Sequence, residues 1–486
     1  MTISDILDQI KATSARAVIE NSIALADKNS QYHALLSMTS DRALKRADEV
    51  DAGKITGKLA GVPFVVKDNF LAFGAPTTAA SKMLEKFNAP LQATAVEKLE
   101  AEGAICIGKA NLDAFAHGSS TENSAFGPTK NAIDPSRVSG GSSGGSAVVT
   151  ALDIVPFALG SDTGGSIRQP ASFNGVVGVK PTYGTVSRYG VVAMASSTDV
   201  IGSFTTNVAD AELVMSIISG KDERDMTTLP DFFAIQPNIK PNQKFGLIKD
   251  FMTDDVDSEV RAKVNDYVEK LRVNGHIVEE VSLPMAEYAL AIYYIIVPAE
   301  ISSNLARYDG IRYGHNVEGV KTLAELYGRT RDEGFVTENK RRIMIGSYVL
   351  SSGFFDAYYL QAQKVRTLLV NEFNELFTKY DGLIGPVAPT TAFKFGENVG
   401  DPIKMYLTDI MTVPTSLAGL PAISVPAGVS KSGLPIGVQL MGPRRSDAAL
   451  LALARSMEVN SAKLNGADKA RPPKLLDEVL AGKEGK

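Results

Sequence analysis

The sequence predicts an α/β protein built around a mixed, mostly parallel β-sheet core that is sandwiched between α-helices. From Val62 onwards, short apolar runs alternate with longer segments of helical pattern. This alternation is typical of strands joined by helical crossovers, which place helices on both faces of a sheet. The composition, 44% hydrophobic and 22% charged over 486 residues, is that of a globular protein with a large buried core.

Residues 1–55 are predicted to form an N-terminal helical segment. Isoleucine, leucine and alanine recur there at intervals that indicate two helices, and Ser4 is the candidate N-cap of the first. Residues 56–465 are predicted to form the main domain. Residues 466–486 are predicted to be a peripheral C-terminal tail, because they are charged and contain two consecutive prolines.

Within the main domain, short apolar runs mark the predicted strands. The segments 93–103 and 111–118, which lie between and after the first two runs, have helical patterns. Residues 284–380 interrupt the strand series with a nearly continuous helical pattern rich in tyrosine and arginine, so they are predicted to cover one end of the sheet. The strands are predicted at Val62–Val66, Ala104–Gly108, Ile154–Leu159, Phe245–Ile248, Ile277–Val281, Gly382–Val387, Ala422–Val425 and Ile436–Met441.

Charge and cysteine content exclude several classes of function. A net charge of −5 offers no basic face for a phosphate backbone, so this chain is not expected to be the main binding site of a nucleic acid. The single cysteine, Cys106, excludes an internal disulfide framework and a multi-thiolate zinc site, and no metal is expected in this chain. The opening residues lack the pattern of a signal peptide, and the apolar stretch Tyr288–Ala299 is shorter than the roughly 20 residues that span a bilayer, so a cytoplasmic location is expected.

Two glycine- and serine-rich stretches carry the most specific signal in the chain. They are GGSSGGS at Gly140–Ser146 and SDTGGSIRQP at Ser161–Pro170, and Lys67 closes an apolar run upstream of both. Apolar segments follow the first stretch and lead into the second, which disfavours a flexible linker, and neither stretch ends in the Gly-Lys-Ser/Thr of a phosphate-binding loop. Such glycines let the backbone aim several N–H groups at one point, and serines in such loops can be nucleophiles.

A serine nucleophile needs a partner that removes its proton, and histidine is the usual one. The four histidines, His33, His117, His276 and His315, lie outside the two stretches and are interpreted as structural. Desolvation favours the neutral amine of a lysine, so Lys67 after its apolar run is the candidate base. The competing interpretation is a lysine at a strand end whose ammonium group reaches water.

These residues together resemble the amidase signature family, whose members use a serine–serine–lysine triad. The resemblance makes Lys67 the base, Ser142 the bridging serine after a cis peptide bond, and Ser166 the nucleophile. Residues 56–465 would then be an amidase signature catalytic domain. The resemblance implies that the oxyanion hole consists of Thr163, Gly164, Gly165 and Ser166.

Further segments are similar to one branch of this family, the glutaminase subunits of tRNA-dependent amidotransferases. They include GSSTENSAFGPTKN at residues 118–131 and SSNLARYDGIRYGH at residues 302–315. The similarity implies that Tyr293, Arg342 and Asp409 recognise glutamine. Arginine can bind the α-carboxylate through two hydrogen bonds, and aspartate can pair with the α-ammonium group.

The resemblance also implies an activity and a set of partners. The protein would hydrolyse glutamine to glutamate and ammonia, and supply the ammonia to a partner that converts Glu-tRNA(Gln) to Gln-tRNA(Gln). The expected partners are the amidotransferase subunits B and C, in a heterotrimer. No cofactor is expected in this chain, because ATP and Mg²⁺ would be used by the partner subunit.

Two alternatives remain at the level of sequence. One is a free-standing amidase of the same fold that acts on another small amide, and the segments 118–131 and 302–315 favour the amidotransferase over it. The other is a scaffold that has lost catalysis, and the intact Lys67, Ser142 and Ser166 argue against it.

Overall fold

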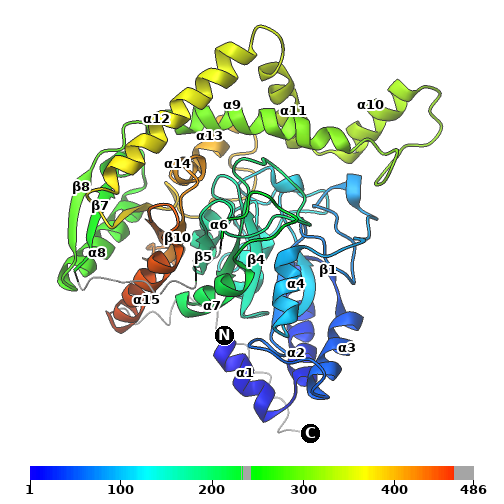
Figure 1. Ribbon diagram of the computed structural model, residues 1–486, viewed down its shortest axis with the longest axis horizontal. Helices are drawn as coiled ribbons and strands as arrows, with labels where there is room; N and C mark the ends of the chain where they lie inside the picture. The colour runs from blue at the N-terminus through cyan, green and yellow to red at the C-terminus, as the bar shows by residue number, and fades with distance from the viewer. Residues whose placement is uncertain (231–232, 234–241, 465–486) are drawn as a thin grey trace.

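An eleven-stranded β-sheet runs through the molecule (Figure 1). The computed structural model describes residues 1–230, 233 and 242–464, so the predicted tail at 466–486 lies outside the described residues. The strands are β1 (Leu35–Met38), β2 (Pro63–Lys67), β3 (Ile105–Ala110), β4 (Phe157–Asp162), β5 (Val177–Lys180), β6 (Val200–Thr205), β7 (Lys244–Ile248), β8 (Ile277–Val281), β9 (Gly382–Pro386), β10 (Ala422–Val429) and β11 (Pro435–Met441). They lie side by side in the order β1-β3-β2-β4-β6-β5-β10-β11-β9-β7-β8.

The predicted α/β fold with a mixed sheet is confirmed. β2 is parallel to β3 and β4, and β7 is parallel to β8 and β9. The other neighbouring strands of the described residues pair antiparallel, so the middle of the sheet is more antiparallel than the sequence pattern indicated. Each predicted strand is present, although β4 begins at Phe157 rather than at Ile154.

Three strands were not predicted. The sequence of each has only a weak strand pattern, and pairing with neighbouring strands stabilises it. β5 (VGVK) is only four residues long, and β6 (VIGSFT) is interrupted by glycine and serine. These two strands pair with each other, and they are also flanked by β10 and β4. β1 lies in the N-terminal segment that was predicted to be helical, and it pairs antiparallel with β3.

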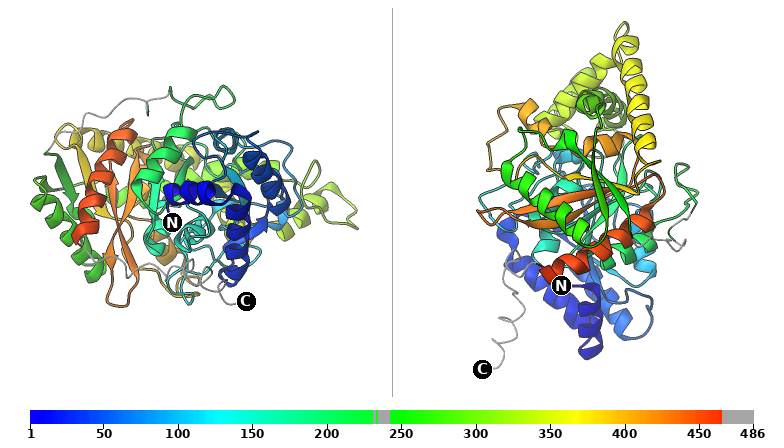
Figure 2. Two further views of the ribbon diagram at one scale, coloured as in Figure 1. Left: turned by 90° about the horizontal axis from the view of Figure 1, so that it is seen from below. Right: turned by 90° about the vertical axis from the view of Figure 1, so that its left-hand side faces the viewer.

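Helices surround the sheet. α7 and α15 lie with α1 at the end of the molecule opposite to α9 and α11 (Figures 1 and 2). The helices are α1 (Ile3–Ala12), α2 (Ala15–Lys28), α3 (Ser40–Asp51), α4 (Thr94–Ala101), α5 (Gly144–Ala151), α6 (Arg168–Asn174), α7 (Val208–Ile218), α8 (Ser258–Val273), α9 (Ala286–Asn304), α10 (Leu323–Gly334), α11 (Thr337–Val349), α12 (Gln361–Leu376), α13 (Pro402–Leu407), α14 (Val413–Leu417) and α15 (Asp447–Leu464).

The N-terminal segment departs from its prediction in two details. It holds α1, α2 and α3 rather than two helices, and Thr2 rather than Ser4 caps the first. The Thr2 hydroxyl accepts a hydrogen bond from the Asp5 N–H (3.1 Å), while the Asp5 carboxylate accepts one from the Thr2 N–H (2.8 Å). This reciprocal capping box satisfies two N–H groups and outweighs a serine inside the first turn.

The predicted helix at residues 111–118 is wrong. Only a 3-10 turn at Ala114–Ala116 is present, and Phe115 has a left-handed backbone with φ of 53°. The Asp113 carboxylate accepts hydrogen bonds from the N–H groups of Thr121 (2.9 Å) and Asn123 (3.1 Å). The loop therefore folds around a buried carboxylate instead of continuing as a helix.

Helices α9 to α12 form the predicted cover over one end of the sheet (Figure 1). Among the described residues, one helix, Ala286–Arg307, is long and apolar enough by length and composition to cross a membrane. The sequence-based expectation that this region is too short is corrected, because the helix continues beyond the apolar stretch. About half of the most apolar stretch of this helix, 56%, is buried inside the protein.

Candidate active site

Lys67 is the last residue of β2, and its side chain is completely buried. Its Nζ lies 2.7 Å from Ser142 Oγ and 3.0 Å from Ser161 Oγ. Desolvation lowers the pKa of Lys67 to about 7, although the nearby carboxylates of Asp113 and Asp162 oppose this shift. The competing interpretation, in which the ammonium group reaches water, is therefore wrong, and a pKa near 7 leaves much of the lysine as a neutral amine at physiological pH.

Ser142 reaches the lysine because the first glycine- and serine-rich stretch folds as a buried turn before α5 and not as a linker. The peptide bond between Gly141 and Ser142 is cis, as the resemblance implied. A Cβ atom on Gly141 would lie 2.2 Å from Asp113 Oδ2, so glycine is required for this close approach. The Gly141 N–H donates to Gln169 Oε1 (2.9 Å), and the Asp113 N–H donates to the Ser142 carbonyl oxygen (3.3 Å).

The second glycine- and serine-rich stretch forms a tight turn between β4 and α6. Gly165 has φ of +147°, and a Cβ atom there would lie 2.2 Å from Thr412 Oγ1. The Thr412 hydroxyl donates to the carbonyl oxygen of Gly164 (2.6 Å) and holds the turn in place. Within the described part of the chain, the backbone N–H groups of residues 163–166 donate no hydrogen bond to protein. Unpaired backbone N–H groups in a buried turn can stabilise an oxyanion when they point at one atom.

Ser166 lies at the end of this turn, beside the first stretch. Its carbonyl oxygen accepts a hydrogen bond from the Ser143 N–H (3.2 Å), which joins the two stretches. The residue is 7% exposed, in contrast to the fully buried Lys67 and Ser142. No hydrogen bond links Ser142 Oγ to Ser166 Oγ among the described residues. Catalytic hydrogen bonds often tighten only when substrate is bound, so this geometry is compatible with a relay.

A fully buried ion pair fixes both ends of the turn. Arg168 Nη2 lies 3.0 Å from Asp162 Oδ1, and both side chains are fully buried. Arg168 also donates to Thr415 Oγ1 (2.6 Å) and Ser416 Oγ (2.9 Å), while Asp162 Oδ2 accepts the Ile167 N–H (3.1 Å). Although desolvation opposes it, the Arg168 charge holds the pKa of Asp162 below its ordinary value. The pair therefore shapes the turn.

Removing this arginine is expected to destabilise the protein strongly. Arg168→Met would leave the buried carboxylate of Asp162 without its partner, which typically costs about 3–5 kcal/mol. The measurement is urea-induced unfolding of the variant and the wild type. Lys379→Met is the control, because it breaks only an exposed helix pair with Glu375 and should change the free energy of unfolding little. Equal effects of the two substitutions would contradict a structural role for the buried pair.

Tyr293, Arg342 and Asp409 converge on this turn from α9, α11 and the loop after α13. A Cβ atom on Gly164 would lie 2.8 Å from the Tyr293 hydroxyl oxygen, so the tyrosine packs directly on the turn. Desolvation raises the pKa of Tyr293, and the positive charge of Arg342 opposes this rise, which places the arginine nearby. Tyr293 therefore lies against the turn, and Arg342 and Asp409 are close enough for their charges to act on it.

The guanidinium group of Arg342 is buried, but only one of its three nitrogens has a hydrogen bond among the described residues. Its Nε donates to Glu338 Oε1 (2.8 Å), and Glu338 also accepts from the Tyr406 hydroxyl (3.1 Å). The group lies over the rings of Tyr294 (5.3 Å) and Tyr406 (5.6 Å). Its two terminal nitrogens have no hydrogen bond among the described residues, so they are available to a carboxylate.

Asp409 presents an unpaired carboxylate oxygen. Its Oδ2 accepts a hydrogen bond from the Ser119 hydroxyl, whereas its buried Oδ1 has no partner among the described residues. Desolvation raises the pKa of Asp409 to about 7, although the Ser119 hydrogen bond and the Arg342 charge oppose the rise. A buried acceptor left unpaired is costly, and an ammonium ligand would satisfy it.

The sequence-based reasoning missed several polar residues around these groups. Asn69 lies in the same VVKDN segment as Lys67, and Ser119 lies in the GSSTENS segment, so both carried a signal. Glu338 lies four residues before Arg342 on α11, so its helical spacing carried a signal. Tyr406 carried none, because only the fold brings this residue of α13 to Glu338 and Arg342. His117 Nδ1 forms a hydrogen bond with Asn339 Nδ2 (2.8 Å), and in the described part of the chain it has no hydrogen bond with Lys67.

Comparison with known proteins places this geometry in a family. The family model Amidase matches residues 17–451. The chain belongs to the amidase family. The expected resemblance to the amidase signature family is thereby confirmed, and the matched range includes Lys67, Ser142 and Ser166.

The relatives cover nearly the whole chain of this amidase family member. The A subunit of a glutamyl-tRNA(Gln) amidotransferase from Thermosynechococcus vestitus is 51% identical over 91% of this chain and 94% of its own length. The corresponding protein from Lacticaseibacillus casei is 50% identical over 93% of this chain and 94% of its own length. The crystal structure of the glutamyl-tRNA(Gln) amidotransferase A subunit from Thermotoga maritima has a TM-score of 0.79 and 40% identity, and covers 95% of this chain and 94% of that chain. A bacterial aryl acylamidase has a TM-score of 0.84 at 25% identity, and covers 98% and 99%.

Proposed function

We propose that this protein is the glutamine-hydrolysing subunit of a tRNA-dependent amidotransferase, which supplies ammonia for the conversion of Glu-tRNA(Gln) to Gln-tRNA(Gln). The proposal rests on two neighbouring groups. One is the unpaired carboxylate oxygen of Asp409, and the other is the Arg342 guanidinium group, whose two terminal nitrogens have no hydrogen bond among the described residues. Together they complement the α-groups of a free amino acid. The names of relatives about 50% identical over 91–93% of this chain support the same activity.

The chemistry follows from the triad. Lys67 accepts the proton of Ser166 through Ser142, and the Ser166 oxygen attacks the carbonyl carbon of the glutamine side-chain amide. The N–H groups of residues 163–166 stabilise the oxyanion. The tetrahedral intermediate collapses when Lys67 returns the proton through Ser142 to the leaving nitrogen, which departs as ammonia. Water then hydrolyses the glutamyl ester on Ser166 and releases glutamate.

Glutamine is held by its α-groups. Arg342 binds the α-carboxylate and Asp409 the α-ammonium group, while Tyr293 closes the site above the turn. The distance between the clamp and Ser166 would then select the length of the side chain.

The partners follow from the same proposal. Subunits B and C would complete a heterotrimer, and a partner subunit would bind Glu-tRNA(Gln), ATP and Mg²⁺ and consume the ammonia. The net charge of −5 on this chain supports the assignment of the tRNA to a partner. An aminoacyl-tRNA substrate also favours the expected cytoplasmic location.

A free-standing amidase is the second candidate, because an aryl acylamidase has nearly the same fold. The experiment is to express this chain alone and together with the B and C subunits from the same genome, and to measure ammonia release from glutamine and from a neutral amide. The proposal expects glutamine to be the preferred substrate and a stable complex to form. Turnover of the neutral amide alone, with no complex, would support the free-standing amidase instead.

The pH dependence of the reaction is expected to report two groups. Lys67 must lose its proton and Asp409 must be ionised to bind ammonium, and both have a pKa of about 7. Both requirements fail as the pH falls, so kcat/KM should drop below neutral pH by about tenfold per group for each pH unit. kcat should report Lys67 alone, because the bound ammonium group keeps Asp409 ionised.

The check is a pH profile of wild type and Asp409→Asn, with His33→Ala as the control. In Asp409→Asn, kcat/KM should depend on the ionisation of Lys67 alone, and kcat should keep its wild-type dependence on pH. The His33→Ala control should match wild type in both profiles. A dependence of kcat that disappears with His33 would contradict the lysine assignment.

A further inference from the structure

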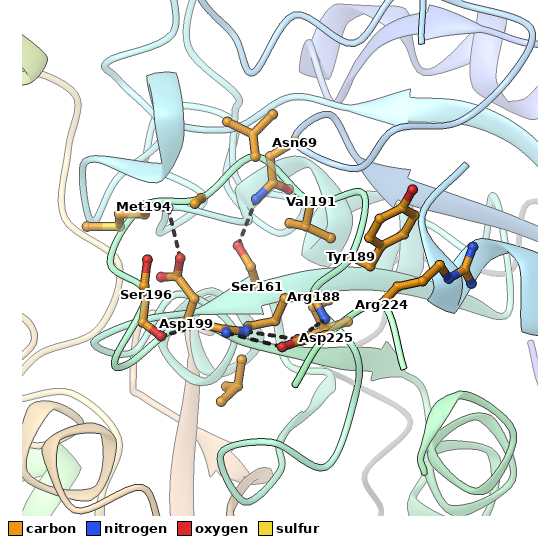
Figure 3. Close-up of a pocket in the computed structure, with 14 residues that line it drawn as sticks. Asn69, Ser161, Arg188, Tyr189, Val191, Met194, Ser196, Asp199, Arg224 and Asp225 are labelled. Atoms are coloured by element: carbon orange, nitrogen blue, oxygen red, sulfur yellow. Dashed lines mark hydrogen bonds and ion pairs between the residues drawn. The ribbon is translucent and has the colours of Figure 1, made fainter. Parts of the chain in front are cut away.

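A pocket of about 200 Å³ lies beside Lys67 and is separate from the residues assigned to the triad and the clamp (Figure 3). Its floor includes Asn69 and Ser161, which are 2% and 5% exposed. Its mouth includes the exposed Ser196 and Arg224. The pocket therefore extends from the surface to the immediate neighbourhood of the buried lysine.

A short chain of hydrogen bonds joins the lysine to this floor. Ser161 Oγ lies 3.0 Å from Lys67 Nζ and accepts a hydrogen bond from Asn69 Nδ2 (3.1 Å). Figure 3 shows Asn69 and Ser161 pointing toward each other at the pocket. Asn69 Oδ1 is buried and has no partner among the described residues. Lys67 thus has Ser142 as one neighbour and Ser161, which lines the pocket, as the other.

The charged residues of the pocket are already paired with protein. Arg188 Nε lies 3.2 Å from Asp225 Oδ2, and Arg224 Nη2 lies 2.6 Å from Glu97 Oε2. Asp199 accepts hydrogen bonds from the Thr163 hydroxyl and from backbone N–H groups. An ionic ligand would have to break these pairs, so water is the best occupant, and the pocket has room for several molecules at about 30 Å³ each.

The reaction leaves one proton to be removed in each cycle. Glutamine and water yield glutamate and ammonia, and if the ammonia leaves uncharged, the new carboxylic acid must release a proton to become a carboxylate. In the proposed mechanism this proton passes through Ser166 and Ser142 to Lys67, which ends the cycle as an ammonium group. Lys67 is the base of the site, and it is fully buried. At saturating glutamine, substrate reoccupies the side of the site that holds Ser166, whereas the pocket lined by Ser161 stays unoccupied by substrate.

We propose that the pocket is a water chamber through which Lys67 exchanges its proton with solvent, with Ser161 as the relay and Asn69 as the residue that orients it. This inference rests on the proposed glutaminase function. The Lys67 ammonium group passes its proton to Ser161 Oγ while the Ser161 hydroxyl proton moves to a water molecule. Lys67 is then neutral, Ser161 again carries one proton, and the water carries the excess proton to the surface.

The test is to fill the chamber without touching the lysine. Ala193 is a partly exposed lining residue, so Ala193→Phe should block the water path, and Ala193→Val should do so less completely. In the assembled amidotransferase, kcat for glutamine hydrolysis is expected to fall roughly 10- to 100-fold in the phenylalanine variant. kcat/KM should stay within about twofold of wild type, since it reports only the first acylation by an enzyme whose lysine is already neutral.

Ser161→Ala should likewise lower kcat and leave kcat/KM nearly unchanged, because it removes the hydroxyl that contacts Lys67. Ala262→Phe is the matched control for added volume, since Ala262 lines a groove beside α8, and it should behave as wild type. Unchanged kcat in a folded Ala193→Phe complex would overturn the proposal, as would equal losses of kcat and kcat/KM.

Intact glutamine hydrolysis with loss of glutamine-dependent amidation would also overturn it, because the pocket would then carry ammonia. If the wild-type complex itself failed to hydrolyse glutamine, the proposed function would be wrong, and that result is distinct from a failure of the chamber alone.

Discussion

Ser166→Ala is expected to abolish glutamine hydrolysis, with a loss in kcat on the order of 10⁶-fold, because no acyl-enzyme can form without its hydroxyl. Lys67→Ala and Ser142→Ala should each cost several orders of magnitude, since the members of a triad act as a unit. The measurement is ammonia release from glutamine by the assembled complex. Ser203→Ala is the matched control, because it removes a buried serine hydroxyl on β6 that has no partner among the described residues.

The three triad variants should still support amidation of Glu-tRNA when ammonium chloride replaces glutamine, since that chemistry belongs to a partner subunit in the proposed function. Loss of ammonium-dependent amidation in a correctly assembled Ser166→Ala complex would contradict this division of labour. Residual hydrolysis of glutamine by Ser166→Ala would instead remove the serine from the role of nucleophile.

The parts of the fold that could be predicted are those in which a continuous run of apolar residues indicates a buried element. β2 and β3 are continuous apolar runs, and such runs are typical of strands buried on both faces. β5 and β6 could not be predicted, because their short, glycine-containing sequences become strands only through pairing with β4 and β10. The helix predicted at residues 111–118 failed for a related reason, since the contacts of the buried Asp113 carboxylate override the local pattern.

In the candidate site, too, residues in local motifs could be predicted, whereas contacts that only the fold creates could not. Lys67 and the two glycine- and serine-rich stretches were recognisable because each is a compact motif, and the structure places Lys67 against Ser142. The contact of Lys67 with Ser161 joins positions 94 residues apart and could not be read from either motif. The shift in the pKa of Lys67 was predictable in direction from its apolar run, but its size depends on the burial and on the carboxylates that the fold assembles around it.

Arg342→Ala and Asp409→Ala are expected to lower kcat/KM for glutamine by about 30-fold to several-thousand-fold. Each removes one partner of a charge pair that is desolvated when the zwitterion binds, and breaking such a pair costs about 2–5 kcal/mol. Both side chains are almost completely buried in the free protein, Arg342 at 3% and Asp409 at 9% exposure, so solvent cannot replace the lost contact. Arg341→Ala is the matched control, because this neighbouring, more exposed arginine also pairs with Glu338 and should affect turnover little.

The measurement that isolates the clamp is kcat/KM for glutamine, asparagine and a small neutral amide in wild type and in both variants. Wild type should discriminate against asparagine, since its shorter side chain cannot reach Ser166 while Arg342 and Asp409 hold the α-groups. The variants should lose activity on glutamine and retain the reaction of Ser166 with the neutral amide, because the triad and the turn at residues 163–166 are untouched. Equal losses on all three substrates would show that the two residues support the fold rather than the substrate, and unchanged glutamine turnover would remove them from the site.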